Sequence, residues 1–427
     1  MEAVTKITRE KMREEIIAHS PVKLIDEVII RAYSDKASDI HIEPAEHECR
    51  VRIRIDGGLV HLGRYKKEIH EEAVARLKVL SSLRTDVRMS PQDGRFKVNI
   101  TGVALNVRLS VVPSFHGEKC VLRLLPQTSH THTLENLGFS VRNEEKINQA
   151  LSATHGMILV VGPTGSGKTT TLYAILQKVS VPEVSAVTLE DPIEYAVGGI
   201  TQIPIYGNGG HGNGNGNVNG GLTFATALRA VVRQDPDVIM VGEIRDTATA
   251  ELSIHAALTG HLLLSTLHTN DAVTALPRLI DMGVEPFLIA STVRAIVSQR
   301  LIRKVCQKCA IERKITASEI EFLEKCRIQC RIQSRMHCVP DGPVVQKITR
   351  GRGCVDCRNS GYSGRTVISE VLLLNEQIGE MIMQKARSDE LRKCAIENGM
   401  TPLIEDAVDK VFQGKTTIEE IVSAYHR

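Results

Sequence analysis

The 427-residue sequence is poor in aromatic side chains and contains no tryptophan. Aromatic residues make up 3% of it, which is unfavourable for a surface that stacks single-stranded bases. The sequence also has no large excess of charge of either sign. Its 53 lysines and arginines are nearly balanced by 50 acidic residues, which leaves a net charge of +3. Such a balance gives no basic field to draw the protein onto nucleic acid, so no nucleic-acid partner is expected.

The sequence also lacks the apolar segments that export or membrane insertion requires. No apolar run approaches the roughly 18 residues that a spanning helix needs. The N-terminus, MEAVTKITREKMREE, is too charged for a signal peptide. With 42% apolar and 24% charged residues, the composition is typical of a soluble globular protein, and the length indicates two or three domains. We therefore expect a cytoplasmic multidomain protein.

The first part of the chain predicts a small α+β domain. Apolar residues recur at helical spacing from Leu24 to Ala32. Apolar residues then alternate with arginines from Val51 to Ile55, and the Asp-Gly-Gly that follows indicates the turn of a β-hairpin. EEAVARLKVLSSL predicts another helix, and RFKVNI, ALNVRLSVV and KCVLRLL predict further strands. The polar stretch PQTSHTHTLENLG is a plausible linker.

Beyond this linker, buried-type strands alternate with helical segments. The strands are MILVVG, SAVTLED, DVIMVGE and HLLLSTLH. Continuous apolar runs between turns and helices indicate a parallel sheet covered on both faces. The last 60 or so residues, from VISEVLLLNEQIGEMI to TTIEEIVSAY, have a helical period and are expected to be helical.

The segment after MILVV matches the phosphate-loop pattern GxxxxGK[ST], and it stands between a strand and a helix as that pattern requires. Small residues let backbone N–H groups approach phosphate oxygens. Lys168 adds a charge at the β- and γ-phosphates, and the Thr169 hydroxyl can bind Mg²⁺. The sequence therefore predicts binding of ATP or a close relative by Gly162, Pro163, Thr164, Gly165, Ser166, Gly167, Lys168, Thr169 and Thr170.

A second glycine-rich segment, YGNGGHGNGNGNVNGG at 206–221, has a different character. It contains no lysine, serine or threonine, and no helix start follows it directly, so it is not a second phosphate loop. Predicted elements of the nucleotide site lie on both sides of it, so it does not separate two domains. Asn-Gly repeats offer no apolar surface to pack, and we predict a flexible loop inside the nucleotide-binding domain.

Acidic residues and histidines lie at the ends of three predicted strands. Glu243 follows DVIMVG, where a carboxylate can hold the magnesium shell or orient an attacking water. His268 follows a strand at the edge where open α/β sheets bind ligands, whereas His261 precedes that strand. Carboxylates at strand ends also serve as helix caps or ion pairs, and this alternative stays open for a cluster made of Glu190, Asp191 and Glu194.

The ten cysteines include two CxxC pairs, and this spacing is typical of metal ligands. In a chain without an export signal, cysteines indicate metal ligation or free thiols more than disulfides. Two CxxC turns can complete a structural Zn(Cys)₄ site, whose closed shell leaves no position for substrate. We therefore predict a zinc site formed by Cys306, Cys309, Cys354 and Cys357. Two features leave free thiols or a swapped ligand open as alternatives: the gap between the two pairs is long, and further cysteines occur within it at 326, 330 and 338.

Several motifs, taken in order, resemble those of the secretion-type ATPases of type IV pilus assembly and type II secretion. They are ASDIHIEP, QDGRF, GPTGSGKTTTLYA, EDPIEY, DPDVIMVGEIRD, TGHLLLSTLHTNDA, the two CxxC pairs and GYSGR. The resemblance implies an α/β fold class, with a RecA-like P-loop ATPase domain after a small α+β PAS-like domain and a helical, zinc-binding C-terminal part. The expected parts are an N-terminal segment (1–19), a PAS-like domain (20–125), a linker (126–138), an ATPase core (139–303), a tetracysteine subdomain (304–366) and a helical subdomain (367–427).

The resemblance also assigns roles to individual residues. It places Glu243 in Walker B, Glu190, Asp191 and Glu194 in an acidic box, and His261 and His268 in a histidine box. It implies that Arg95 and Arg108 reach nucleotide, with Arg123 less securely placed, although arginines alternating along a strand by themselves favour a solvated face. Which carboxylate acts as base, Glu243 or one in EDPIE, is left open. The tetracysteine zinc site is a mark of assembly rather than retraction ATPases.

The function that the resemblance implies is that of a cytoplasmic hexameric ATPase, with ATP, Mg²⁺ and Zn²⁺ as cofactors, that powers pilin or pseudopilin assembly. Its expected partners are other copies of itself, an inner-membrane platform protein and a cytoplasmic membrane-recruitment protein, through which alone it would lie at the membrane. A retraction or DNA-uptake motor and a nucleotide-regulated binding module with little turnover are the alternatives. Relatives usually carry an extra N-terminal domain before the stretch that the resemblance covers, so recruitment through that domain is left open. They also have a shorter loop in place of 206–221, and the longer loop is either neutral or reaches a neighbouring subunit.

Overall fold

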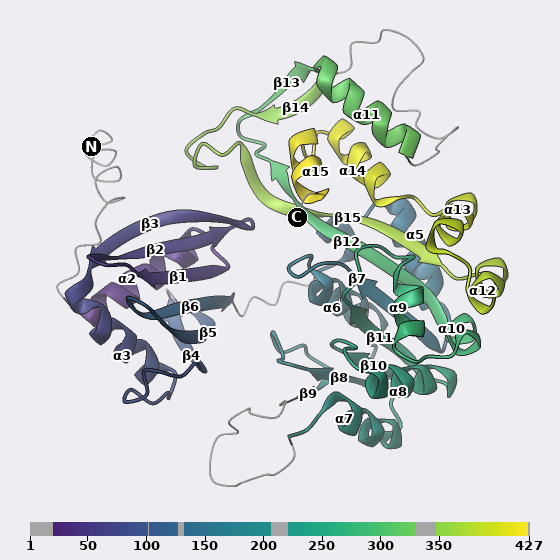
Figure 1. Ribbon diagram of the computed structural model, residues 1–427, viewed down its shortest axis with the longest axis horizontal. Helices are drawn as coiled ribbons and strands as arrows, with labels where there is room; N and C mark the ends of the chain where they lie inside the picture. Colours follow the sequence, from purple (N-terminus) through teal and green to yellow (C-terminus); the bar gives the residue numbers. More distant parts are fainter. Residues whose placement is uncertain (1–19, 101, 127–131, 206–220, 330–346, 426–427) are drawn as a thin grey trace. The chain divides into compact units, whose positions relative to one another are not determined.

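The computed structural model describes residues 20–100, 102–126, 132–205, 221–329 and 347–425. The chain divides into two compact units, Met1–His130 and Thr131–Arg427 (Figure 1). Each unit has its own sheet. Most of the Gly/Asn-rich segment, and the cysteines at 330 and 338, lie outside the described residues.

The first unit is an antiparallel sheet with two helices packed on one face. The strand order is β3-β2-β1-β6-β5-β4. The elements are α2 (Pro21–Ser34), β1 (Asp39–Pro44), β2 (Glu48–Ile55), β3 (Gly58–Lys66), η1 (Lys67–Ile69), α3 (His70–Leu80), β4 (Gln92–Ile100), β5 (Val103–Ser114) and β6 (Gly117–Pro126).

The helices and strands predicted for this unit are confirmed. The helical spacing corresponds to α2, whose apolar stripe is buried in a core shared with α3 and the sheet. The alternating segment corresponds to the β2–β3 hairpin. Its turn residues Asp56 and Gly57 have φ of 48° and 86°, which is the left-handed pair that a two-residue hairpin turn needs.

The second unit is built on a seven-stranded sheet of order β15-β12-β7-β11-β10-β8-β9. All neighbouring strands are parallel except β15, which runs antiparallel to β12. These strands are β7 (Gly156–Val161), β8 (Ala186–Glu190), β9 (Thr201–Pro204), β10 (Val238–Val241), β11 (Leu262–Leu267), β12 (Val293–Val305) and β15 (Tyr362–Leu373). The four predicted strands are β7, β8, β10 and β11.

Helices cover both faces of this sheet, as the continuous apolar strands predict. Along β7, Leu159 and Val161 enter one core and Ile158 and Val160 enter another. The helices are α4 (Leu134–Leu137), α5 (Val141–Leu151), α6 (Lys168–Val179), α7 (Phe224–Val231), α8 (Thr247–Leu258), α9 (Ala275–Asp281), α10 (Pro286–Thr292), α11 (Ala317–Gln329), α12 (Glu376–Met383), α13 (Ser388–Glu397), α14 (Leu403–Phe412) and α15 (Ile418–Tyr425), with η2 at Val232–Gln234.

One expectation for the C-terminal part is wrong. The run VISEVLL belongs to β15, not to a helix, and pairs with β12 from Ala295 to Leu301. A short buried apolar run is compatible with a helix or with a strand. The long edge of β12 that does not pair with β7 offers hydrogen-bond partners to this run, and that pairing makes it a strand. The rest of that region is helical as predicted, from α12 to α15.

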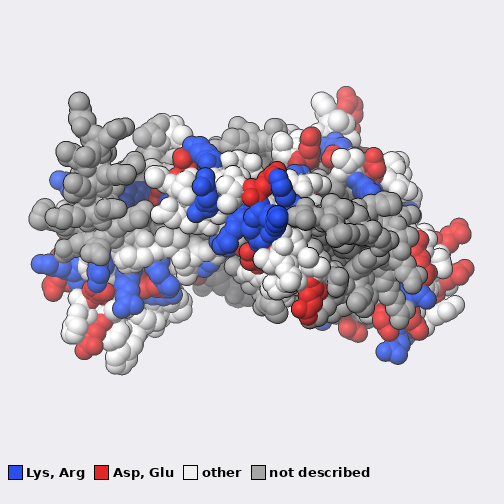
Figure 2. Space-filling model, turned by 90° about the horizontal axis from the view of Figure 1, so that it is seen from above, with Lys and Arg blue, Asp and Glu red and all other residues white. Residues whose placement is uncertain are grey.

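A small two-stranded sheet lies outside the main one. Its strands are β13 (Ala310–Lys314) and β14 (Lys347–Gly351). Within the described residues, no helix combines the length and the apolar character needed to cross a bilayer. Figure 2 shows both basic and acidic side chains on the face in view.

Candidate active site and metal centre

The phosphate loop joins β7 to α6, as the pattern predicts. Gly162, Gly165 and Gly167 have φ of 144°, 78° and 88°, in the region that favours glycine. A Cβ at Gly162 would also lie 2.5 Å from the Gln299 carbonyl oxygen. Side chains at these positions would therefore reshape the loop, whose backbone leads into the start of α6, where an anion can bind.

Lys168 is folded over the loop at the first position of α6. Its Nζ donates to the carbonyl oxygens of Gly162, at 2.8 Å, and Pro163, at 3.2 Å. Burial lowers the pKa of this amine, and the carboxylate of Glu243 acts in the opposite direction. The lysine thus lies within electrostatic reach of the Walker B carboxylate that the sequence singled out.

Gln299 is part of the site although no motif pointed to it. It lies on β12, and its Nε2 donates 2.8 Å to the carbonyl oxygen of Ser166 at the base of the loop. The pairing of β12 with β7 brings it there from 133 residues away. Nothing in the local sequence distinguishes Gln299 from other buried amides, so only the strand order reveals it.

Glu243 lies just beyond the carboxyl end of β10, between two basic groups. One oxygen is 2.6 Å from Nη2 of Arg245, and the other is 3.3 Å from Nε2 of His268. The hydrogen bond that Arg245 donates to Glu243 is the main reason that the pKa of Arg245 is raised, and the charge of Asp191 contributes as well. The structure therefore brings Glu243, His268 and Asp191 to one edge of the sheet, together with Arg245, which the sequence analysis did not single out.

Glu190 has a different environment at the end of β8. Its side chain is buried, and its oxygens accept hydrogen bonds from the hydroxyl of Tyr173, from the hydroxyl of Thr188 at 2.6 Å and from Nε2 of Gln202 at 3.1 Å. All three donors are neutral, and burial beside Glu190 raises the pKa of Tyr173. These contacts tie β8 to α6 and β9. Glu194 follows Asp191 on the segment between β8 and β9.

The two histidines lie at opposite ends of β11. His268 follows the strand and contacts Glu243, whereas His261 precedes it. The Nδ1 of His261 hydrogen bonds the Ala256 carbonyl oxygen at 2.9 Å, which closes the turn after α8. A strand of six residues separates the two by about 20 Å. Within this unit, His261 is therefore not adjacent to the phosphate loop.

The arginines of the first unit form a row across its sheet. Arg95, Arg108 and Arg123 are register partners on β4, β5 and β6, and Arg123 is in turn paired with Asp39 on β1. Arg123 Nε lies 3.1 Å from Asp39, and Arg54 approaches the same carboxylate at 3.6 Å. The row lies on the face opposite the apolar core. Like charges directly opposite each other destabilise a sheet, and Asp39 offsets this effect for Arg123.

The four cysteines of the CxxC pairs come together as predicted. Cys306 and Cys309 follow β12, Cys354 and Cys357 precede β15, and all four Sγ atoms lie within 4.8 Å of one another. The Sγ–Sγ distances include 3.9 Å for 306–354, 3.8 Å for 309–357 and 3.7 Å for 354–357. Tetrahedral zinc with Zn–S bonds of about 2.3 Å requires sulfur separations of about 3.8 Å. The residues fit this metal.

The surroundings of this cluster favour a thiolate at Cys357, whereas burial raises the pKa of Cys309 to about 12. Burial opposes ionisation of Cys357, but the backbone N–H groups of Cys354 and Gly361 donate to its Sγ at 3.1 and 3.3 Å. Together with the neighbouring thiols they lower the pKa of Cys357 to about 6. Backbone donors around metal thiolates hold the ligands in position before the metal arrives.

Comparison with known proteins agrees with this geometry. The family model described as "Type II/IV secretion system protein" matches residues 16–423. The type II secretion system protein HxcR of Pseudomonas aeruginosa is 40% identical over 94% of this chain and 76% of its own length. The type IV pilus assembly ATPase PilB of Thermus thermophilus is 39% identical over 94% of this chain and 42% of its own. In structure, the ATPase DotB of Legionella pneumophila aligns with a TM-score of 0.67 at 20% identity, over 96% of this chain and 98% of its own, which shows a shared fold.

The fold and the phosphate loop define a P-loop ATPase with a parallel sheet. More particularly, the chain belongs to the type II/IV secretion system protein family. The resemblance stated from the motifs is thereby confirmed, as is the fold class. The finer domain boundaries and the roles of individual site residues stay predictions.

Proposed function

We propose that this chain is a cytoplasmic, Mg²⁺-dependent ATPase that works as a homohexamer and powers pilin or pseudopilin assembly, in a type II secretion system or a type IV pilus. The observation that supports it most directly is Glu243, held between Arg245 and His268 beyond β10 while Lys168 covers the loop. The names of the relatives support the assignment to a secretion system or a pilus. The proposed partners are an inner-membrane platform protein and a cytoplasmic recruitment protein.

In this proposal the loop N–H groups and Lys168 hold the phosphates, and the Thr169 hydroxyl and Glu243 provide oxygen for the magnesium shell. When bound, Mg²⁺ would supply positive charge to the phosphate oxygens, and the Thr169 hydroxyl and the Glu243 carboxylate are the groups that would hold it. Glu243, with His268 and Arg245 fixing its two oxygens, orients the attacking water. Arg95 and Arg108, which are register partners on β4 and β5, supply positive charge to the nucleotide in this proposal.

The test is ATP hydrolysis per subunit across a range of protein concentrations, with Glu243→Gln as control. We expect the activity per subunit to climb with protein concentration, because a ring completes its sites only on assembly. The Glu243→Gln variant should lose this activity. Activity that is independent of concentration would contradict the ring. Negligible turnover with tight ATP binding would instead favour the nucleotide-regulated binding module.

The cysteine cluster is proposed to hold a structural zinc ion, as in assembly rather than retraction motors. Cys306→Ser is expected to reduce zinc to well below one ion per chain and to lower the melting temperature. Zinc is measured by atomic absorption on purified protein. The matched control is Cys394→Ser, a buried cysteine on α13 outside the cluster, which should keep its zinc. Unchanged zinc in Cys306→Ser would contradict the assignment.

A further inference from the structure

The segment between β11 and α9, residues 268–274, begins with the candidate site residue His268. His268 contacts Glu243 at 3.3 Å, so the path of this segment decides how the histidine meets that carboxylate. The segment forms no helix or strand of its own. Its position therefore depends on contacts with other elements, and two residues of the C-terminal part of the chain supply them.

Glu370 of β15 holds the middle of this segment. Its side chain is buried, with the residue 2% exposed, and one carboxylate oxygen accepts the backbone N–H of Ala272 at 2.8 Å. The other oxygen accepts the backbone N–H of Leu403, the first residue of α14, at 3.1 Å. One side chain thus joins the segment that carries His268 to the start of a C-terminal helix.

The register of the sheet explains why Glu370 lies at this level. One row of register partners crosses four strands: Leu267 on β11, Val161 on β7, Ser298 on β12 and Glu370 on β15. Leu267 and Val161 are the last residues of their strands, so the row lies where the phosphate loop and His268 both leave the sheet. Glu370 is therefore placed at the carboxyl edge of the parallel strands, although its own strand runs in the opposite direction.

Arg392 of α13 holds the same segment from a second side. Its Nη2 lies 2.7 Å from one carboxylate oxygen of Asp271. The other oxygen of Asp271 accepts the backbone N–H of Thr274 at 2.8 Å, just before α9 begins. Burial raises the pKa of Glu370, and the N–H of Ala272 and the charge of Arg392 oppose that rise. The two C-terminal side chains therefore form one charged cluster around the segment.

A carboxylate is an unfavourable choice for this place if its only task is to fill space. Ile368, Val371 and Leu372 of the same strand are buried and apolar, and a further apolar side chain would avoid the desolvation of a carboxylate. A carboxylate differs from them in fixing a direction, because charge-assisted hydrogen bonds depend on geometry. Two oxygens bound to two N–H groups give the segment one defined position relative to α14.

We propose that Glu370 and Arg392 are positioning residues, which hold the segment 268–274 so that His268 reaches Glu243. The inference rests on the proposed ATP hydrolysis at this site. Both residues belong to the C-terminal part of the chain, on β15 and α13. This part of the protein then acts on the reaction through His268 and not by contact with the reacting atoms.

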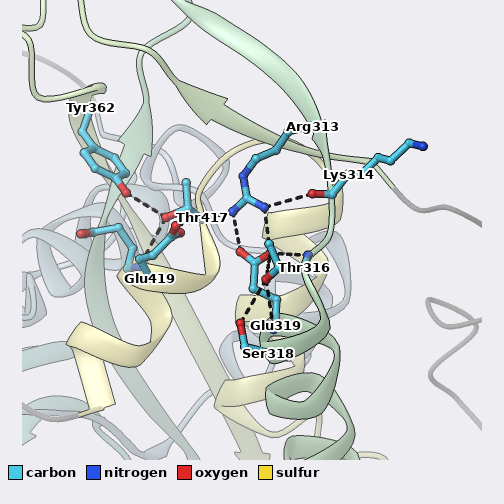
Figure 3. A network of polar contacts seen from close by, with 9 residues as sticks. Arg313, Lys314, Thr316, Ser318, Glu319, Tyr362, Thr417 and Glu419 are labelled. Carbon is cyan, nitrogen blue, oxygen red and sulfur yellow. Dashed lines mark hydrogen bonds and ion pairs between the residues drawn. The ribbon is translucent and has the colours of Figure 1, made fainter.

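A second polar network in the C-terminal part provides a comparison (Figure 3). Arg313 of β13 pairs with Glu319 of α11 and lies 3.5 Å from Glu419 of α15. In the described part of the chain, the polar partners of the Glu319 carboxylate are Arg313 and Thr316, and neither belongs to the segment 268–274. Loss of Glu319 should therefore weaken the C-terminal part without moving His268.

The experiment is a double-mutant cycle on the full chain, in which ATP hydrolysis is measured for the wild type, Glu370→Gln, His268→Ala and the double variant. An amide offers one acceptor oxygen where a carboxylate offers two. We expect Glu370→Gln to lower kcat about threefold to tenfold and to leave the KM for ATP within about twofold. In the His268→Ala background the same change should alter kcat by less than about twofold, because residues that act through one another are not additive.

Arg392→Ala provides a second test if Glu370→Gln does not fold. The side chain of Arg392 is 37% exposed, so its loss is compatible with a folded chain. We expect a loss of kcat in the same direction, again only when His268 is present. Arg392→Lys should recover part of this loss, because lysine keeps the positive charge beside Asp271 but not the planar guanidinium.

The matched controls are Asp406→Asn and Glu319→Gln. Asp406 of α14 is 2% exposed, and it accepts the backbone N–H of Ser369, the neighbour of Glu370, at 2.8 Å. Its other partner in the described residues is Lys410, so it does not contact the segment 268–274. Both controls should lower the melting temperature, and kcat per folded molecule should stay within about twofold of the wild type.

Three outcomes would overturn the inference. An equal loss of kcat from Glu370→Gln in both backgrounds would mean that Glu370 does not act through His268. Wild-type kcat in Glu370→Gln and Arg392→Ala would mean that the segment needs neither contact. A comparable loss of kcat in the two controls would mean that any weakening of the C-terminal part has this effect. If the wild-type chain itself does not hydrolyse ATP, the proposed function fails, and the inference fails with it.

Discussion

Glu190 is the last residue of β8, and Glu243 follows the adjacent parallel strand β10 at the same edge of the sheet, yet their surroundings differ in kind. Glu190 is buried and accepts hydrogen bonds from three neutral groups. Glu243 is 14% exposed in its side chain and lies between Arg245 and His268. Hydrogen bonds within the fold occupy the oxygens of Glu190, whereas Arg245 and His268 can exchange Glu243 for other partners.

The difference shows why residue type and strand position are not enough to assign a role. A buried carboxylate whose oxygens are occupied holds elements together, since leaving its donors unpaired is costly. A partly open carboxylate next to a phosphate loop is available to water or a metal ion. We therefore assign Glu243 to the reaction and Glu190 to the positioning of β8, β9 and α6, as a hypothesis that the following variants test.

The largest expected effect is that of Glu243→Gln on turnover. Loss of the carboxylate should lower kcat at least about a hundredfold, the range of a lost general base or water-orienting group. ATP affinity should change little, because the phosphate-binding groups stay in place. Steady-state hydrolysis together with nucleotide binding measures both. A variant that retains most of its turnover would transfer the role to one of the carboxylates of EDPIE.

Glu190→Gln should act on stability instead. An amide cannot accept from all three donors, and leaving a buried group unpaired costs about 1–3 kcal/mol of unfolding free energy. Thr188→Val, which removes one donor and keeps the shape, should cost less. Chemical denaturation of both variants gives the comparison. Normal stability combined with a collapse of kcat in Glu190→Gln would reverse the two assignments.

The histidines at the two ends of β11 sharpen the same contrast. His268→Ala removes the contact with Glu243 and should lower kcat by about tenfold, the equivalent of one hydrogen bond to a charged group. His261→Ala should leave kcat within about twofold, because its contact closes a turn at the far end of the strand. Both variants are measured at a protein concentration where the activity per subunit no longer rises, and equal losses of kcat there would contradict this separation.

The smallest effect concerns a buried group with no role in the reaction, His70 of the first unit. It hydrogen bonds the Tyr65 hydroxyl at 2.7 Å and the Glu118 carbonyl oxygen at 2.9 Å, and burial lowers its pKa. The unfolded chain therefore takes up the proton first as the pH falls below about 6.5. Stability from the neutral ring, complete above that pH, should decline towards the lower pKa of the folded state.

The measurement is the free energy of unfolding of the wild type and His70→Gln between pH 8 and pH 5. The difference between the two should shrink as the pH falls, and kcat per folded molecule should be the same in both. A difference that is constant with pH would mean that His70 does not titrate in this way.

Much of the site could be predicted because its chemistry is local. The phosphate loop is a continuous segment, and its glycines, Lys168 and Thr169 are recognisable from spacing alone. The cysteine pairs were also recognisable, although whether Cys306 meets Cys354 depends on β12 and β15 lying together. Gln299 and Arg245 were missed, since an amide on a strand and an arginine after one carry no signal until their neighbours are known.

The sequence by itself determined the elements whose pattern lies within one segment: the α2 stripe, the β2–β3 turn, the buried parallel strands and the phosphate loop. The tertiary structure decided what depends on partners distant in the chain. It placed VISEVLL in a strand because β12 offered an edge to pair with, and it separated Glu190 from Glu243 by the donors around each. It also brought α15 against the phosphate loop. Spacing encodes local backbone preference, whereas burial and hydrogen-bond partners exist only once the sheet has assembled.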